Sequence, residues 1–199
     1  MRPFLILLIA MAFGGLTYRA TSVILPSYFE SMDFKWHGLM ASLAYGLGSL
    51  GQYAGGRLAD RFDLRAAYLG FHVLSIPFVF SLFLMSGLPV FAAAGLFIFF
   101  NMGMQPIENS LVAKFTPERW RSTGYGMKFT LVFSIGATSV PMVRRIGESY
   151  SLPHVFLGVG VAVILMLVVS CLLVMATRGI ELRNRPADED AADVATIGN

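Results

Sequence analysis

Six apolar stretches separated by short polar links make up most of this chain. A helix needs roughly 20 predominantly apolar residues to cross the hydrocarbon core of a bilayer, and each stretch is about that long. The short links predict that successive helices are antiparallel and adjacent. We therefore expect an all-α membrane protein, with a bundle of six transmembrane helices over residues 1–178. The stretches cover approximately residues 4–29, 38–58, 66–86, 89–114, 121–145 and 154–177.

Polar side chains are concentrated in the first and fourth stretches, whereas the third and sixth are almost wholly apolar. Helices that are apolar on all sides place much of their surface in lipid. The order polar, intermediate, apolar thus occurs twice, which predicts two repeats of three helices. The polar residues are Thr17, Tyr18, Arg19, Thr21 and Ser22 in the first stretch and Asn101, Gln105, Glu108, Asn109 and Ser110 in the fourth.

The composition agrees with a membrane protein and excludes several other classes. Hydrophobic residues make up 56% of the chain and charged residues 14%, which is too apolar for an ordinary soluble domain. The single cysteine excludes a disulfide framework. The net charge of +3 comes from basic residues in the links, so we expect no nucleic-acid partner. The chain has neither the spacing of a metal site nor a phosphate-binding glycine loop, so we expect no metal, no cofactor and no enzymatic activity.

The basic residues predict how the bundle is oriented. Cytoplasmic links of membrane proteins carry an excess of Lys and Arg. With both termini cytoplasmic, eleven basic residues lie inside and only three, Lys35, Arg144 and Arg145, lie outside. We therefore expect a multi-pass protein of an inner or plasma membrane with both termini in the cytoplasm. Residues 179–199 are rich in charged and small residues, which predicts a mobile cytoplasmic tail.

The link between the second and third stretches carries a recognisable pattern, Gly56-x-x-x-Asp60-Arg61-x-x-x-Arg65. This spacing resembles the cytoplasmic signature loop of the major facilitator superfamily of membrane transporters. Asp63 and Leu64 stand where that loop usually has a glycine and a basic residue. The segment 115–124 also resembles a later loop of the superfamily. The resemblance covers about residues 4–178 and best fits the C-terminal six-helix half of such a transporter.

The resemblance implies a cytoplasmic gate formed by Gly56, Asp60, Arg61 and Arg65. In the family, the matching aspartate faces the N-terminus of a helix in the other half, where the helix dipole attracts an anion. The arginines then add charge-assisted hydrogen bonds. The alternative is that these charges only set the topology and cap helix ends.

Three charged residues within the apolar stretches are candidates for binding or coupling. Arg19 lies about 15 residues into the first stretch, where it either serves a cavity or snorkels to the outer headgroups. Glu108 and Lys128 lie at similar depth on neighbouring helices, which predicts an ion pair. This pair either takes up a proton during transport or statically stabilises the bundle. Tyr18, Gln105 and Asn109 complete the predicted site.

A transporter of this family normally has twelve helices, so the resemblance implies that a second half is required. That half is a second copy, a separate chain or another membrane protein. The small-residue pattern Gly51-x-x-x-Gly55 allows close approach of a neighbouring helix, and in the family the second helix of each repeat lies between the halves. Two functions remain open: a half-size secondary transporter of a small solute, with or without coupling to protons, and a non-transporting scaffold, assembly or accessory subunit of a larger membrane complex.

Overall fold

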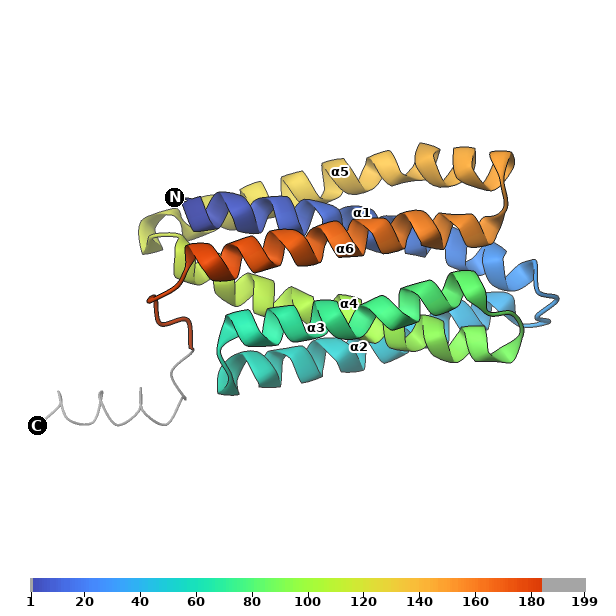
Figure 1. Ribbon diagram of the computed structural model, residues 1–199, viewed down its shortest axis with the longest axis horizontal. Coiled ribbons are helices and arrows are strands. Elements are labelled where there is room, and N and C mark those ends of the chain that lie inside the picture. Colours follow the sequence, from blue (N-terminus) through green and yellow to red (C-terminus); the bar gives the residue numbers. More distant parts are fainter. Residues whose placement is uncertain (1, 184–199) are drawn as a thin grey trace, which may run out of the picture.

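The structure of the chain is a computed structural model that describes residues 2–183. Within that range the fold consists of six long α-helices joined by short connections, as Figure 1 shows. Their bounds are α1 (Arg2–Glu30), α2 (His37–Arg61), α3 (Leu64–Leu84), α4 (Leu88–Phe115), α5 (Arg121–Ser149) and α6 (Leu152–Ala176), with one 3-10 turn, η1 (Glu118–Trp120), before α5.

Five of the helices, all except α2, are long and apolar enough to cross a membrane. By length and composition, the expectation of six apolar spans is confirmed for five stretches and not for the second. The helix itself is present and has 25 residues, but glycines, two tyrosines and Gln52 replace much of its apolar surface. Its length and its place in the bundle, rather than its hydropathy, match those of its neighbours.

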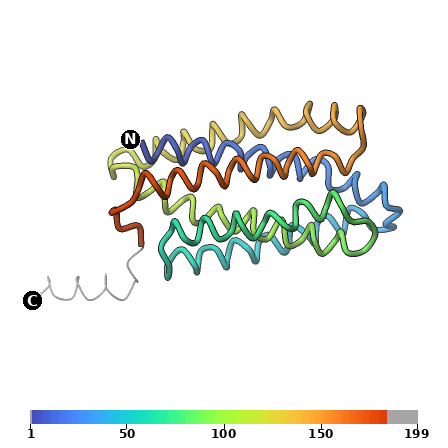
Figure 2. Tube along the Cα trace, viewed as in Figure 1, coloured from blue at the N-terminus to red at the C-terminus, as the bar shows by residue number. Residues whose placement is uncertain are grey.

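The helices form two groups of three that lie side by side (Figure 2). In one group α1 packs against α5 and α6, and in the other α4 packs against α2 and α3. The two groups are joined mainly where α3 packs against α6. As a result, α1 and α4 lie at the centre of their groups, and these are the two helices that carry the polar residues.

The apolar core is divided into two clusters. One contains Tyr28, Phe29 and Phe156, and the other contains Leu7, Met11 and Leu111. In a membrane, such clusters are stabilised mainly by van der Waals packing between helices, because lipid is as apolar as these side chains. The N-terminus, the α2–α3 link, the α4–α5 link and the end of α6 all lie at one end of the bundle (Figure 1). This end carries most of the basic links, and we call it the basic end.

The glycines of α2 allow it to approach α4 of the same chain. A Cβ atom at Gly51 would collide with the carbonyl of Phe99, and one at Gly55 would collide with the carbonyl of Gly103. The predicted close approach is therefore confirmed, but its partner is an internal helix. The resemblance implied a contact between two halves at this helix, and Gly51 and Gly55 are not available for it.

Candidate functional site

A cavity of about 310 Å³ lies among the helices that carry the polar residues. Its wall comes chiefly from α1, α4 and α5, with one residue each from α2 and α6. The lining includes Met11, Gly14, Tyr18, Gln52, Asn101, Gln105, Glu108, Asn109, Lys128, Phe129, Phe133 and Met166. Tyr18, Gln105, Glu108, Asn109 and Lys128, all predicted from the sequence, meet in this cavity. It combines amides, one ion pair, aromatic rings and methionines, which is typical of a site for a small molecule.

The centre of the site is an ion pair between α4 and α5. Lys128 Nζ lies 3.2 Å from Glu108 Oε2. The residues are only 4% and 7% exposed, respectively. An isolated charge at such a position would be costly, and a neighbouring opposite charge reduces that cost. The predicted pairing of these two residues is therefore present in the structure.

Two further hydrogen bonds orient the pair. Lys128 Nζ donates to Asn109 Oδ1 at 2.7 Å, and the Tyr68 hydroxyl donates to Glu108 Oε1 at 3.1 Å. The ammonium group thus has two acceptors on α4, and each carboxylate oxygen has a partner on a different helix. Tyr68 comes from α3, which the sequence presented as an apolar helix. A phenol within an apolar span usually needs a partner for its hydroxyl, and this was the signal that could have identified Tyr68.

The amide side chains of the cavity also pair across helices. Gln52 of α2 donates to Gln105 of α4 at 2.9 Å, and Asn101 of α4 donates to the Thr17 hydroxyl of α1 at 3.3 Å. An amide has both donor and acceptor groups, so each pair retains further capacity to bind a solute. Gln52 and Asn101 were not among the predicted site residues, although Asn101 belongs to the polar part of the fourth stretch.

Tyr18 and Arg19 are adjacent in α1 but lie in different environments. Tyr18 lines the cavity, and its ring contacts Tyr45 of α2 edge-on, with centroids 6.1 Å apart. Arg19 is exposed and is not part of the cavity wall. One residue along a helix turns the side chain by about 100°, and the Cβ atom of Arg19 is thereby directed towards Gly136 of α5.

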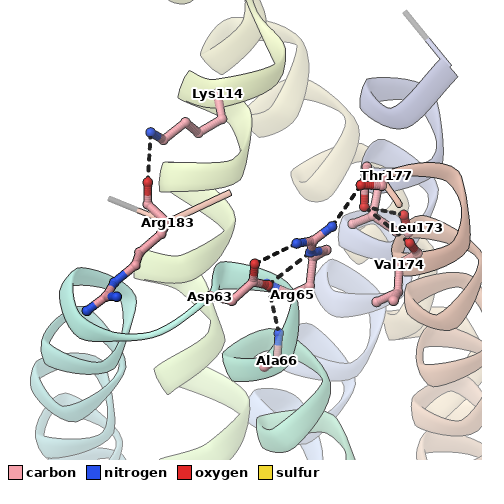
Figure 3. A network of polar contacts seen from close by, with 8 residues as sticks. All are labelled: Asp63, Arg65, Ala66, Lys114, Leu173, Val174, Thr177 and Arg183. Atoms are coloured by element: carbon pink, nitrogen blue, oxygen red, sulfur yellow. Dashed lines mark hydrogen bonds and ion pairs between the residues drawn. The ribbon is translucent and has the colours of Figure 1, made fainter. Parts of the chain in front are cut away.

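The predicted gate residues all lie at the basic end, but their environments differ. Asp60 and Arg61 are exposed, and neither side chain forms an ion pair within residues 2–183. A Cβ atom added at Gly56 would lie in ordinary contact distance of Pro106 of α4. Arg65, in contrast, is engaged inside the chain, as Figure 3 shows.

Arg65 and Asp63 connect the start of α3 to the end of α6 (Figure 3). Asp63 caps α3 by accepting hydrogen bonds from the backbone N–H groups of Arg65 and Ala66. The Arg65 side chain donates to both Asp63 oxygens, at 2.9 and 2.7 Å, and to the Thr177 carbonyl at 2.7 Å. Hydrogen bonding from Arg65 lowers the pKa of Asp63 below its ordinary value of 3.8. In the sequence, Asp63 was noted only as a departure from the family pattern.

The segment after α6 continues this network. Leu64 N donates to the Leu182 carbonyl at 3.1 Å, and Lys114 Nζ donates to the Arg183 carbonyl at 3.1 Å. The Leu182 side chain is only 2% exposed. The first residues of the predicted tail, up to Arg183, thus pack against the α2–α3 link and α4. The remainder, residues 184–199, lies outside the described residues, and its mobility stays a prediction.

Residues 1–141 match the sequence model of the Major Facilitator Superfamily. Among solved structures, the fold resembles the peptide transporter POT in complex with sulfate, with 20% identity and a TM-score of 0.82. That comparison covers 99% of this chain and 44% of the transporter. A mutant of POT in complex with alafosfalin also matches, with 20% identity, a TM-score of 0.80, and coverage of 98% and 44%.

The curated proteins include no match to this chain. The chain spans less than half the length of the solved structures that it resembles. At 20% identity these structures establish the likeness of fold alone.

Proposed function

The chain belongs to the Major Facilitator Superfamily, and we propose that it forms one six-helix half of a secondary transporter that moves a small solute with protons. The observation that carries this proposal is the buried pair of Glu108 and Lys128 on the cavity wall. A scaffold gains little from a charged pair of this kind, because well-packed apolar residues of similar volume are often at least as stable.

The proposed coupling uses the two states of Glu108. While Lys128 is close, its ammonium group stabilises the charged form of the carboxylate. When the helices move and the pair separates, desolvation favours the neutral form, and Glu108 takes up a proton from the cavity. The proton is released when Lys128 returns. The cavity residues Gln105 and Asn109 would then hold the solute by hydrogen bonds while the aromatic and methionine side chains contact its apolar parts.

We also propose that the bundle consists of two three-helix repeats. In support, α1 is packed by α5 and α6, and α4 is packed by α2 and α3. The first helix of each proposed repeat therefore contacts the second helix of the other repeat, in the pairs α1–α5 and α4–α2. The two third helices, α3 and α6, contact each other. This exchange is the pattern expected when two equivalent units are related by an approximate twofold axis.

The proposed second half covers the open side of the cavity. Phe133 on that wall is 68% exposed and Phe129 is 46% exposed. The half is supplied by a second copy, by a separate chain, or by a further part of a longer chain. With the basic end in the cytoplasm, exposed Asp60 and Arg61 are free to form the cytoplasmic gate with that half. Arg65 instead donates a hydrogen bond to the Thr177 carbonyl at the end of α6.

The test is proton movement linked to solute entry. Proteoliposomes that contain the chain and an internal pH-sensitive dye would be given an inward solute gradient of amino acids, short peptides, sugars or lipophilic drugs in turn. Acidification of the interior that requires both the protein and one solute class supports the proposal. A chain that forms stable complexes with other membrane proteins, but moves no proton with any solute class, would favour the alternative of a scaffold or assembly subunit.

A further inference from the structure

The carboxylate of Glu108 is held from two sides. The Tyr68 hydroxyl of α3 donates to Oε1 at 3.1 Å, while Lys128 of α5 lies 3.2 Å from Oε2. Tyr68 is only 1% exposed, so bulk water does not compete for this hydrogen bond. The two contacts together determine the orientation of the carboxylate plane between α3 and α5.

We infer that Tyr68 is a positioning residue that holds the Glu108 carboxylate turned towards Lys128. A hydroxyl that donates to a carboxylate stabilises the charged form more than the neutral form. Tyr68 therefore opposes proton uptake by Glu108 until the helices move. The transport meaning of this role rests on the function proposed above, but the hydrogen bond and its effect on protonation do not.

The other ionisable groups around Glu108 act less directly. Apart from Tyr68 and Lys128, those on the neighbouring helices are Tyr18 of α1, His72 of α3 and Tyr125 of α5. From α2 and α6, Gln52 and Met166 face the cavity, and neither ionises. Tyr125 donates to the backbone carbonyl of Asn109. His72 Nδ1 lies 2.7 Å from the backbone carbonyl of Tyr68, so its bond is to the Tyr68 main chain. Among the described residues, the contacts with the carboxylate oxygens thus come from Tyr68 and Lys128.

The proton balance of the step is simple. Glu108 accepts one proton from a hydronium ion in the cavity, which leaves a water molecule, and becomes a neutral carboxylic acid, while Tyr68 keeps its own proton. The net charge of the pair changes from zero to +1, which resides on Lys128. Loss of the Tyr68 hydroxyl removes one donor from the ionised form only. Protonation of Glu108 then occurs at a higher pH.

The direct experiment is an infrared titration of the purified chain in detergent. Glu108→Gln identifies the carboxylic-acid C=O band that belongs to Glu108. In Tyr68→Phe, the midpoint of this band should move up by about one pH unit, equivalent to about 1.4 kcal/mol, which agrees with the strength of a hydrogen bond to a charged group. Tyr28→Phe is the matched control, because Tyr28 is also 1% exposed and its hydroxyl donates to the backbone of Leu82.

A second variant keeps the hydroxyl and the fold. Fluorotyrosine at position 68 is a more acidic phenol and hence a stronger donor, so the midpoint should move to lower pH. An unchanged midpoint in the folded Tyr68→Phe protein, or equal shifts in Tyr68→Phe and Tyr28→Phe, would overturn the inference. If Tyr68→Phe fails to fold, an unmoved midpoint in the fluorotyrosine protein would overturn the inference instead.

This outcome is separable from that of the transport proposal. A shifted midpoint in a protein that moves no proton with any solute supports the role of Tyr68 and contradicts transport. Coupled transport that depends on Glu108, together with an unmoved midpoint in Tyr68→Phe, contradicts the role of Tyr68 and supports transport.

Discussion

Arg65, at the start of α3, donates a 2.7 Å hydrogen bond to the main-chain carbonyl of Thr177, the residue that follows α6. The same guanidinium forms an ion pair with Asp63. One arginine thus joins the cap of one helix to the end of another. Cations near a helix C-terminus interact favourably with its free carbonyls and dipole, so the contact stabilises the basic end within this chain.

Asp63→Asn should weaken this connection while retaining an oxygen that caps α3. We expect a loss of up to about 1 kcal/mol at neutral pH, since the pair is partly exposed. The pKa of Asp63 is lowered in the folded chain, so its contribution is fully present above the ordinary value of 3.8 and disappears as the pH falls through the lower folded value. Unfolding in detergent at pH 7 and at low pH measures the difference.

The control for that experiment is Asp60→Asn, in the same link. Asp60 is exposed and forms no ion pair within residues 2–183. Its replacement should leave stability unchanged at both pH values. An Asp63→Asn protein whose deficit persists undiminished at low pH would show that the charge of Asp63 is not the source of the stabilisation.

Lys128→Met should leave Glu108 buried without its cation. Breaking a buried pair in this way typically costs roughly 3–5 kcal/mol. The double variant Lys128→Met with Glu108→Gln should recover much of that loss, because neither charge remains. Thermal unfolding of the two single variants and the double variant gives the coupling energy.

An exposed pair provides the comparison. Arg144 and Glu148 lie 2.8 Å apart on the surface of α5, and Arg144→Gln should leave the stability almost unchanged because solvent screens this pair. Equal losses of stability in Lys128→Met and Arg144→Gln would mean that burial does not make the Glu108–Lys128 pair more important for stability than an exposed pair.

Gly55→Ala tests the close packing of α2 on α4. A Cβ atom at Gly55 would collide with the backbone carbonyl of Gly103, and backbone cannot move aside as a flexible side chain does. Overpacking of this kind typically costs roughly 1–3 kcal/mol. At Gly46 of the same helix a Cβ atom would meet nothing within 4 Å, so Gly46→Ala should be tolerated. Thermal unfolding of both variants decides the matter, and a stable Gly55→Ala protein would contradict the described packing.

Much of the fold could be predicted because long apolar runs leave a chain few alternatives in a membrane. The helix ends deviate from the predicted boundaries by only a few residues. The exception is α2, whose hydropathy is lowered by glycines that serve packing against α4. Close helix packing and high hydropathy make opposite demands on such positions, and a hydropathy pattern reports only one of them.

The candidate site was predicted in part. Glu108 and Lys128 were paired correctly because their depths in neighbouring helices follow from counting residues. Tyr68 was missed because its partner lies 40 positions away in the sequence. The position of Arg19 outside the cavity depends on how α1 is rotated about its axis. Neither long-range contacts nor helix rotation are encoded in the local pattern of polar and apolar residues.

The central claim is that Glu108 carries the coupled proton, and the most direct measurement is solute accumulation by Glu108→Gln in vesicles with an imposed pH gradient. The variant keeps the volume of the side chain but removes its charge. We predict that gradient-driven accumulation is abolished while exchange of solute across the membrane continues. Glu148→Gln, which removes an exposed carboxylate on α5, should accumulate solute normally. Undiminished accumulation by the folded Glu108→Gln protein would contradict the claim.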